Sequence, residues 1–223
     1  MDRKRITYGD DMDKLTQAFN FRHACKVFDE NKKIPQEEVN YILEAGRKSP
    51  SSFGLEPWHF IVVSDNKIKA ALKPVCFEQK QITTCSHLVI VLYRKAGQFS
   101  LQSDYLRKAV ARNLPNNTDI DSACQYFINY SQSLTDGHDL NHWSELQGYI
   151  ASANMLTAAA YLGIDSCAIG GFEHDKVIEI LEQVLPQFNR NDFGITLCLA
   201  FGYRKNQQSE QIRWSLDEIT TFL

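Results

Sequence analysis

The sequence has no run of about 18 consecutive apolar residues, so it predicts no membrane span. Its first residues, MDRKRITYGDDMDK, are polar and lack the apolar core of a secretory signal. The 24 basic and 27 acidic residues leave a net charge of −3, which does not favour nucleic acid or an anionic membrane as a partner. Together these absences predict a cytoplasmic protein that binds neither nucleic acid nor a membrane.

Cysteine pairs at metal-site or redox-site spacing are also missing. None of the 6 cysteines follows another in a C-x-x-C pattern, which argues against a zinc site or a thioredoxin-like pair. Without a secretory signal, we expect reduced thiols, most of them small buried side chains. His138 and His142 are four residues apart with no third ligand evident, so we interpret them as surface histidines and predict no metal site.

Common nucleotide-binding and catalytic motifs are absent as well. The sequence contains no G-x-G-x-x-G, no G-x-x-x-x-G-K-[ST] and no G-x-S-x-G, which argues against a Rossmann site, a P-loop and a hydrolase nucleophile elbow. No repeat, low-complexity tract or Pro/Gly/Ser linker divides the chain. With 43% hydrophobic residues, the sequence predicts one domain with a full-sized core over residues 1–223.

Short apolar runs rich in β-branched and aromatic residues predict strands. These runs lie at residues 58–64, 87–94 and 193–203. The run at 87–94 is continuously apolar, which indicates a strand buried on both faces.

Helical patterning appears between these strands. An apolar stripe after Pro35 predicts a helix through about Arg47, and 175–185 predicts another amphipathic helix. Residues 142–162 predict a buried helix, because the middle of this segment is apolar nearly all round and rich in Ala and Ser. The polar stretch 95–141, with a helical pattern at its 120–133 portion, either covers a binding site or is a variable surface excursion.

Cationic and glycine-rich segments are candidates for ligand binding. Arg22, His23 and Lys26 crowd together with no acid among them, which is typical of either a solvated turn or an anion site. Gly170 and Gly171 follow a strand-like apolar segment. Such a pair either makes a turn or lets backbone N–H groups approach a flat ligand.

Two polar loops are further candidates. In SPSSFGLEPWHF, Ser51 and Ser52 either hydrogen-bond a neutral polar ligand or belong to a simple helix–strand connection. After the last strand come Arg204, Lys205 and Arg213. Most such side chains are solvated, but a guanidinium can hold a phosphate with two hydrogen bonds, which makes Arg213 a candidate.

The order and spacing of these segments resemble the FMN-dependent nitroreductase family. The array runs from RHACKVFD through SPSSFGLEPWHFIVV and CFEQKQITTCSHLVIV to LGIDSCAIGGF and a basic tail after GY. It is most similar to the oxygen-insensitive, metronidazole-activating subgroup. The resemblance implies an α+β three-layer sandwich, in which helices flank a mainly antiparallel sheet. It also implies an intertwined homodimer whose C-terminal extension, 204–223, crosses onto the partner, with 95–141 as a variable helical excursion near the active-site cleft.

The resemblance also implies which residues meet the FMN phosphate and ribityl chain. Arg22 and His23 match the segment that contacts them, and Arg213 would complete the phosphate clamp. Ala24 replaces the usual Ser, and Gln211 replaces the usual Lys, so one hydroxyl and one cation are missing. A charge-assisted hydrogen bond is worth about 1.5–3 kcal/mol, so we expect a lower FMN affinity than is typical.

Other matched positions surround the isoalloxazine. Lys26 matches a lysine at the pyrimidine edge, where an ammonium stabilises the negative charge of the reduced flavin. Glu78 and Gln81 match two more positions at this edge, and the Glu78 carboxylate would repel the reduced flavin unless protonated or turned away. Cys167 either faces the flavin or fills the core, and we favour the core. The remaining matches are a loop that the partner brings over the flavin and a strip beneath its dimethylbenzene and N5 side: Pro50, Ser51, Ser52, Phe53, Gly54, Ile169, Gly170 and Gly171.

The activity that the resemblance implies is a two-electron reduction. NADPH or NADH would reduce the flavin and leave, and a nitro or quinone compound would then accept both electrons in a ping-pong sequence. No catalytic acid or base is implied, since the chemistry belongs to the cofactor. Two alternatives stay open: a quinone, enone or flavin reductase with incidental nitro reduction, and a flavin-binding module without turnover.

Overall fold

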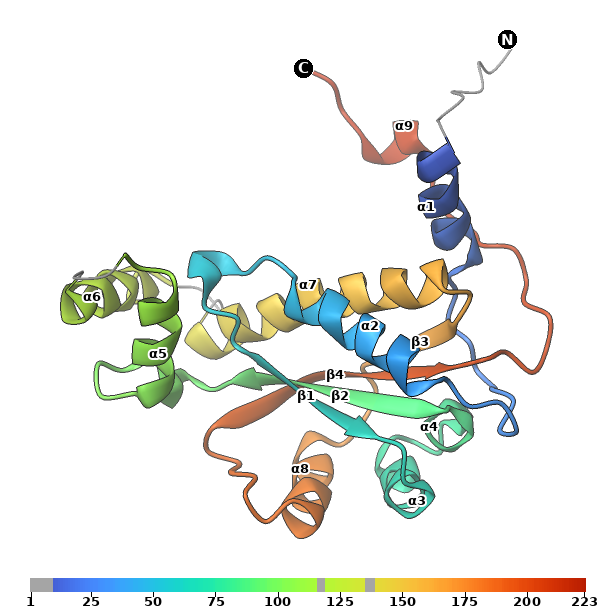
Figure 1. Cartoon of the computed structure of the whole chain (residues 1–223), viewed down its shortest axis with the longest axis horizontal. Helices are drawn as coiled ribbons and strands as arrows, with labels where there is room; N and C mark the ends of the chain where they lie inside the picture. Colours follow the sequence, from blue (N-terminus) through green and yellow to red (C-terminus); the bar gives the residue numbers. More distant parts are fainter. Residues whose placement is uncertain (1–9, 116–118, 135–138) are drawn as a thin grey trace.

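The centre of the molecule is an antiparallel sheet. The structure, a computed structural model, describes residues 10–115, 119–134 and 139–223. Within these residues the sheet has the strand order β1-β2-β4-β3 (Figure 1), with every neighbouring pair antiparallel. The strands are β1 Trp58–Val63, β2 His87–Arg94, β3 Asp165–Ile169 and β4 Phe193–Gly202. β2 and β4 are therefore central, and β1 and β3 are the two edges.

Helices cover both faces of this sheet (Figure 1). On one face lie α2 (Gln36–Arg47) and α7 (Leu140–Tyr161). On the other lie α3 (Asn66–Val75), α4 (Lys80–Thr84) and α8 (His174–Val184). The expected α+β three-layer sandwich is confirmed.

The central strand β2 explains why its sequence is apolar without alternation. Leu88, Ile90 and Leu92 pack in the cluster beneath α3 and α8. Val89 and Val91, on the opposite face, pack with the residues of α2 and α7. Successive side chains of a strand point to opposite faces, so a strand between two helical layers must be apolar at every position.

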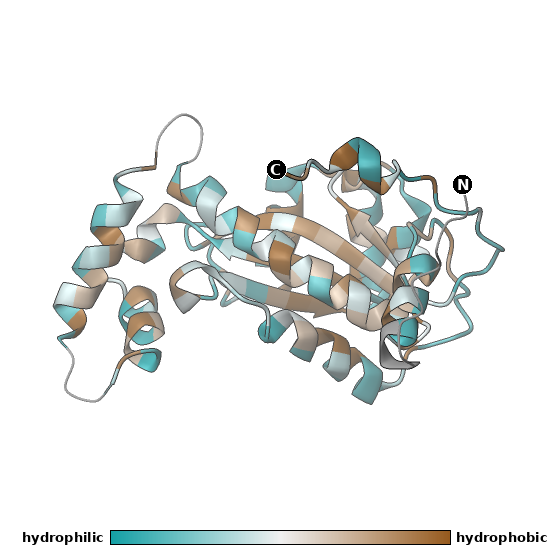
Figure 2. Ribbon diagram, turned by 90° about the horizontal axis from the view of Figure 1, so that it is seen from above, coloured by the Kyte–Doolittle hydropathy of each residue, from teal (hydrophilic) through white to brown (hydrophobic). Residues whose placement is uncertain are grey.

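The polar stretch after β2 forms a helical excursion. It contains η2 (Ala96–Phe99), α5 (Asp104–Arg112) and α6 (Ile120–Ser131). Seen from above, it projects beyond one end of the sheet (Figure 2). It has its own apolar cluster, which also takes in Leu55 before β1 and Trp143 of α7.

The opposite end of the sheet carries both ends of the described chain. There α1 (Asp10–Phe21) stands beside the segment after β4, which includes the short α9 (Leu216–Ile219) (Figure 1). None of the described helices is long and apolar enough to cross a membrane. The described residues also bring together no group of three or more His, Cys, Asp or Glu side chains able to hold a metal ion.

The predicted strands are confirmed to within one residue at either end, and the three predicted helices to within two. The helical pattern at 120–133 corresponds to α6, whereas α1, α3, α4, α5 and α9 were not predicted. The start of α3 did have a local signal, because the Asp65 carboxylate accepts hydrogen bonds from the Lys67 and Ile68 amides as an N-cap. Pro74 lies in the last turn of α3 and obscured the helical pattern.

Candidate functional site

The predicted cationic segment lies at the edge of the sheet beside β3. Ala24 forms a parallel bridge with Ser166 of β3, and the Cys25 amide donates to the Ser166 carbonyl at 3.0 Å. Four residues later, Phe28 bridges to Arg204, just past β4. The segment that begins at Arg22 is thus held between the start of β3 and the end of β4, where the two ends of the described chain meet.

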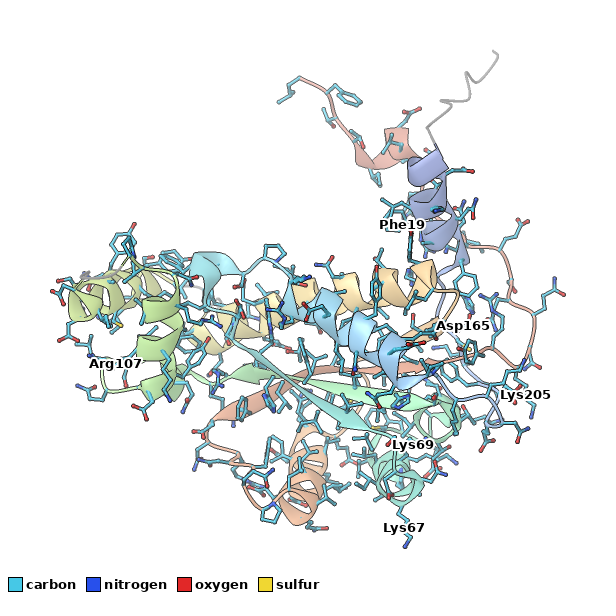
Figure 3. All side chains as sticks on the ribbon, in the orientation of Figure 1. Phe19, Lys67, Lys69, Arg107, Asp165 and Lys205 are labelled. Carbon is cyan, nitrogen blue, oxygen red and sulfur yellow. The ribbon has the colours of Figure 1, made fainter. Side chains whose placement is uncertain are left out.

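One buried carboxylate organises this corner. Asp165, at the start of β3, accepts hydrogen bonds from the Arg204 Nε at 2.7 Å and the Arg204 amide at 2.8 Å. The same guanidinium lies 4.3 Å from the centre of the Phe21 ring. His23 Nε2 lies 3.8 Å from an Asp165 oxygen. Figure 3 shows Asp165 and Lys205 at this end of the molecule. Asp165 and Arg204 were missed as site residues, since the sequence suggested a solvated Arg204.

The His23 ring has a defined orientation. Its Nδ1 lies 3.0 Å from the Phe21 carbonyl oxygen, and because a carbonyl only accepts, Nδ1 must be the donor. Its Nε2 is buried and has no hydrogen-bond partner among the described residues. With Nδ1 as the donor, the neutral ring presents Nε2 as an acceptor, which suits a hydroxyl donor and not a phosphate oxygen.

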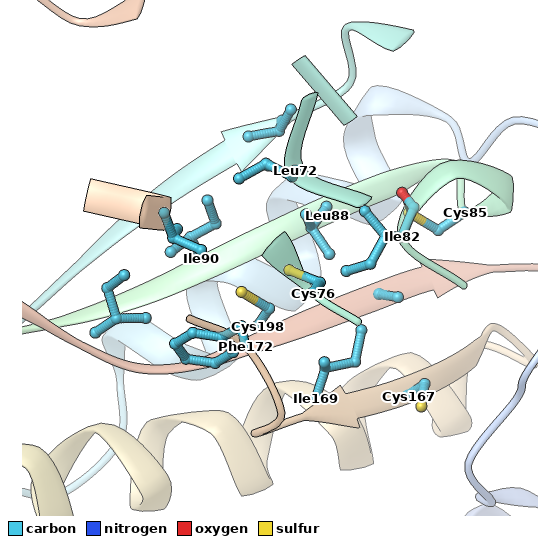
Figure 4. Packing of buried hydrophobic residues seen from close by; sticks show 14 of the residues in the cluster. Leu72, Cys76, Ile82, Cys85, Leu88, Ile90, Cys167, Ile169, Phe172 and Cys198 are labelled. Carbon is cyan, nitrogen blue, oxygen red and sulfur yellow. Dashed lines mark hydrogen bonds between the residues drawn. The ribbon is translucent and has the colours of Figure 1, made fainter. Parts of the chain in front are cut away.

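Lys26 reaches from the same segment toward β3. Its Nζ lies 3.8 Å from the Cys167 sulfur, while the residue as a whole is exposed. Cys167 is buried in the core together with Ile169 (Figure 4), in agreement with the core placement favoured from the sequence. Burial raises the pKa of the Cys167 thiol, and the Lys26 ammonium opposes that rise. A neutral thiol carries no negative charge to pair with the Lys26 side chain, which leaves that side chain available to an anionic neighbour.

The glycine pair forms an open strip at the end of β3. A Cβ built on Gly170 would meet nothing within 4 Å, and one on Gly171 would make only ordinary contact, at 3.5 Å or more, with Phe77 and Gln79. Neither glycine has a positive φ. Their missing side chains are therefore not required by the backbone conformation or by packing within the chain. The strip gives a flat ligand room to lie against the backbone.

The turn that faces this strip carries Glu78, and Gln81 follows it in α4. The Glu78 carboxylate is turned toward Lys73, 3.3 Å from its Nζ. Gln81 is buried, and its Nε2 donates to Gln79 Oε1 at 2.8 Å. Gln79, which sequence reasoning missed, donates in turn to the Gly171 carbonyl at 2.8 Å. These contacts fasten the turn to the glycine strip.

The tail brings Gln211 to the end of α1. Its Nε2 donates to the carbonyls of Phe19, at 2.7 Å, and of Arg22. Gln211 therefore caps the last turn of α1, whose carbonyls have no partner within the helix. Arg213, two residues on, is exposed and donates to the Ile212 carbonyl at 2.6 Å.

The serine-containing loop lies elsewhere. Pro50 is exposed, the Ser52 amide donates to Gln147 Oε1 at 2.9 Å, and the Ser51 hydroxyl accepts from the Glu56 amide at 2.9 Å. Phe53 has a φ of 57°. Its ring packs against α6 of the excursion, 4.9 Å from the Tyr130 ring and 5.3 Å from the Phe127 ring, between centroids. The Gly54 carbonyl accepts from Asn113 at 3.0 Å, so the loop is tied to the excursion.

This loop and the cationic segment do not meet within one chain. β1, which follows the loop, and β3, which carries Asp165, are opposite edges of the sheet. Trp58 pairs with Tyr93 and through it faces Gly194, whereas Asp165 pairs with Gly202. Those two positions on β4 are roughly 26 Å apart at about 3.3 Å per residue.

Two kinds of comparison agree on the family. The model of the nitroreductase family matches residues 20–203. A protein of Staphylococcus epidermidis provisionally named an NAD(P)H nitroreductase is 41% identical over 218 residues, 94% of this chain and 96% of that one. The similarly named YfkO of Bacillus subtilis is 35% identical, over 94% of this chain and 97% of that one.

A solved structure adds the same fold. It is described as a nitroreductase from Exiguobacterium sibiricum in complex with FMN, and it superposes with a TM-score of 0.76 at 22% identity. The superposition covers 94% of this chain and 97% of that one. The chain belongs to the nitroreductase family.

Proposed function

We propose that this protein is an FMN-dependent NAD(P)H oxidoreductase that reduces nitro compounds by two electrons in a ping-pong sequence. One observation carries the proposal: a strip of backbone that neither packing nor conformation requires to be glycine lies beside a cluster of cations. Gly170 and Gly171 form the strip, and Arg22, His23 and Lys26 form the cluster. A flat aromatic system with an anionic arm fits this arrangement. The alternative substrates are quinones and enones, because an open site does not distinguish among planar acceptors.

The residues divide between the two ends of such a ligand. Arg22 would hold the phosphate together with Arg213 from the tail. The Nε2 of His23, an acceptor when Nδ1 donates, would accept a hydrogen bond from a hydroxyl of the ribityl chain. Lys26 and Gln81 would face the electron-rich edge, where an ammonium favours the reduced, anionic form. The bound FMN would supply the hydride-transfer chemistry. The protein's contribution is then position and charge, and no side chain is assigned as an acid or a base.

The phosphate clamp is weaker than the family pattern in two places. Ala24 offers no hydroxyl, and the Gln211 amide is already engaged with the carbonyls at the end of α1. Each missing charge-assisted hydrogen bond is worth about 1.5–3 kcal/mol. FMN would bind more weakly than to a chain that has Ser and Lys at these positions.

The proposal includes a homodimer. The strand positions next to the loop and next to the cationic segment face points on β4 that are roughly 26 Å apart, so a second chain would have to bring such a loop to the same ligand. Exposed apolar side chains support this, since Ile212 and Trp214 of the tail are 92% and 76% exposed.

A cleft on the surface of the chain could receive this apolar tail from a partner subunit. A cleft of about 1130 Å³ runs along the edge strand β1 between α2 and α5, and its lining includes the apolar side chains of Leu43, Leu55, Trp58 and Phe60. In the proposed dimer, the partner's residues 204–223 occupy this cleft, and the excursion 95–141 stands beside the shared ligand.

The purified protein tests the proposal directly. A yellow protein that NADPH bleaches without air and metronidazole recolours would support a nitroreductase of the metronidazole-activating kind. Recolouring by a quinone or an enone but not by a nitro compound would favour the alternative. Yellow colour that neither NADPH nor NADH bleaches would identify a binding module. Light scattering at twice the mass of one chain supports the dimer, and a monomer with bound FMN would contradict it.

A further inference from the structure

The loop between α2 and β1 has a backbone that its own residues do not favour. Phe53, Gly54 and Glu56 have φ values of 57°, 62° and 52°. This left-handed region is unfavourable for a residue with a Cβ, because the side chain crowds the following carbonyl. Such a backbone persists only where its surroundings impose it, which is common at functional sites.

The helical excursion supplies these surroundings. The Tyr105 hydroxyl of α5 donates to the Leu55 carbonyl at 2.9 Å. Asn113, the residue that caps the end of α5, donates from its Nδ2 to the Gly54 carbonyl at 3.0 Å. In Figure 1 the loop lies next to α5. Helix α5 and its cap therefore hold two consecutive carbonyls of the loop.

Asn113 makes the closest fit to the loop. A Cβ built on Gly54 would lie 2.9 Å from Asn113 Nδ2, closer than side chains normally approach. The same Nδ2 also donates to the Ala109 carbonyl at 3.3 Å, one turn earlier in α5. A carboxamide nitrogen has two hydrogens, so these two bonds use both of them. The Asn113 amide is thus fastened to α5 and lies where only a residue without a side chain leaves room for it.

Capping of α5 does not explain this arrangement. The bond to Ala109 would suffice for the helix, and at an exposed position water would satisfy the second hydrogen of the amide. The bond to Gly54 instead joins two segments 59 residues apart in the sequence. It makes the shape of the loop depend on the position of α5.

We propose that Asn113 is a positioning residue that holds the loop of Ser51 to Gly54 in the shape that covers FMN. The inference rests on the proposed function, in which this loop reaches the ligand bound by the partner subunit. It gives the excursion a task beyond standing beside the ligand, because the excursion then shapes a loop that binds it. Asn113 acts through the loop and does not itself have to touch the flavin.

The test measures loop order and FMN binding separately. Hydrogen exchange of the backbone amides of residues 52–56, followed by mass spectrometry, reports loop order. Equilibrium dialysis of the FMN-loaded protein gives the dissociation constant of FMN. The variants are Asn113→Ala, which removes the amide, and Asn113→Asp, which keeps its shape but has no hydrogen to donate at neutral pH. Asn129→Ala is the matched control, since Asn129 is an exposed asparagine of α6 in the same excursion and accepts from Gln125 within that helix.

Asn113→Ala and Asn113→Asp should speed exchange in residues 52–56 and weaken FMN binding by about three- to tenfold, the effect of losing one hydrogen bond. Asn129→Ala should change neither quantity, and exchange in β2 and β4 should stay at the parent rate in every variant. Gly54→Ala should also weaken FMN binding, since its Cβ would push Asn113 Nδ2 aside. Because both substitutions break the same bond, adding Asn113→Ala to Gly54→Ala should weaken binding little further.

Other results overturn the inference. These are unchanged loop exchange in both Asn113 variants, unchanged FMN binding despite a looser loop, an equal loss in Asn129→Ala, or fully additive losses from Asn113→Ala and Gly54→Ala. Parent protein that binds no FMN would refute the proposed function and this inference with it. Parent protein that binds FMN equally well with and without the Asn113 amide would refute only the inference.

Discussion

Replacing Asp165 with asparagine tests the corner that holds the cationic segment. The Asp165 side chain is 3% exposed and accepts the Arg204 Nε, at 2.7 Å, and the Arg204 amide, at 2.8 Å. Asparagine keeps the shape but removes the charge that balances the Arg204 guanidinium. It also turns one of the two acceptor atoms into a donor that faces Arg204.

The structure sets the size of the effect. Removing one partner of a buried ion pair costs about 3–5 kcal/mol, because the other charge is left without compensation. The Arg204 side chain is 29% exposed, so water can relieve part of that cost and the lower end applies. For a chain of 223 residues, a loss of about 3 kcal/mol lowers Tm by roughly 6–12 °C.

Urea denaturation and thermal unfolding measure this loss, and a double-mutant cycle with Arg204→Met isolates the pair. Asp121→Asn is the matched control, because Asp121 pairs with Arg107 on the exposed surface of the excursion. An exposed pair contributes about 0–1 kcal/mol. If Asp165→Asn costs no more than Asp121→Asn, or if the cycle shows no coupling, Asp165 does not hold this corner together.

Three further predictions concern the clamp, the thiols and a buried lysine. Arg213→Ala should weaken FMN binding roughly tenfold or more without lowering Tm, and an unchanged fluorescence titration would remove Arg213 from the clamp. Burial raises the pKa of Cys25 to about 11 and that of Cys85 to about 12. In the unfolded chain these thiols lose their protons above a pKa of about 8.5, whereas in the folded chain they keep them. The free energy of unfolding should therefore fall as pH rises from about 8.5 toward 11, seen as a falling urea midpoint. Lys69 is fully buried, donates to the Cys85 carbonyl at 2.7 Å, and has a pKa lowered by desolvation. Because the unfolded chain then binds more protons, Lys69 adds a rise in stability with pH that ends at about 10.4. Lys69→Met should remove that rise and steepen the alkaline loss, and parallel pH profiles of parent and variant would contradict this.

The strands could be predicted because their signal is local. Residues 58–64, 87–94 and 193–203 are apolar at positions that one strand alone determines, and their observed bounds differ by at most one residue. Helices α3 and α5 escaped prediction because charged residues and a late proline interrupt their stripes.

The site could be predicted only where a motif carried it. The glycine strip and the cationic segment are visible in the sequence. The contacts of Asp165 with Arg204, 39 residues apart, and of Gln79 with Gly171, 92 residues apart, are not. Pairings across such separations depend on strand order, which no local pattern specifies. The orientation of Glu78 toward Lys73 also depends on two left-handed residues that the sequence alone disfavours.

The distance between Arg22 and the loop of Ser51 has a genetic consequence. If each flavin draws Arg22 from one subunit and Ser51 from the other, a lesion at either position damages both pockets of a pure dimer. In a mixed dimer, one subunit carries the Arg22 substitution and the other carries the Ser51 substitution. One flavin site then contains both substitutions, and the other site contains neither. Two inactive alleles expressed in one cell would then complement each other, and the phenotype would depend on the allele pair.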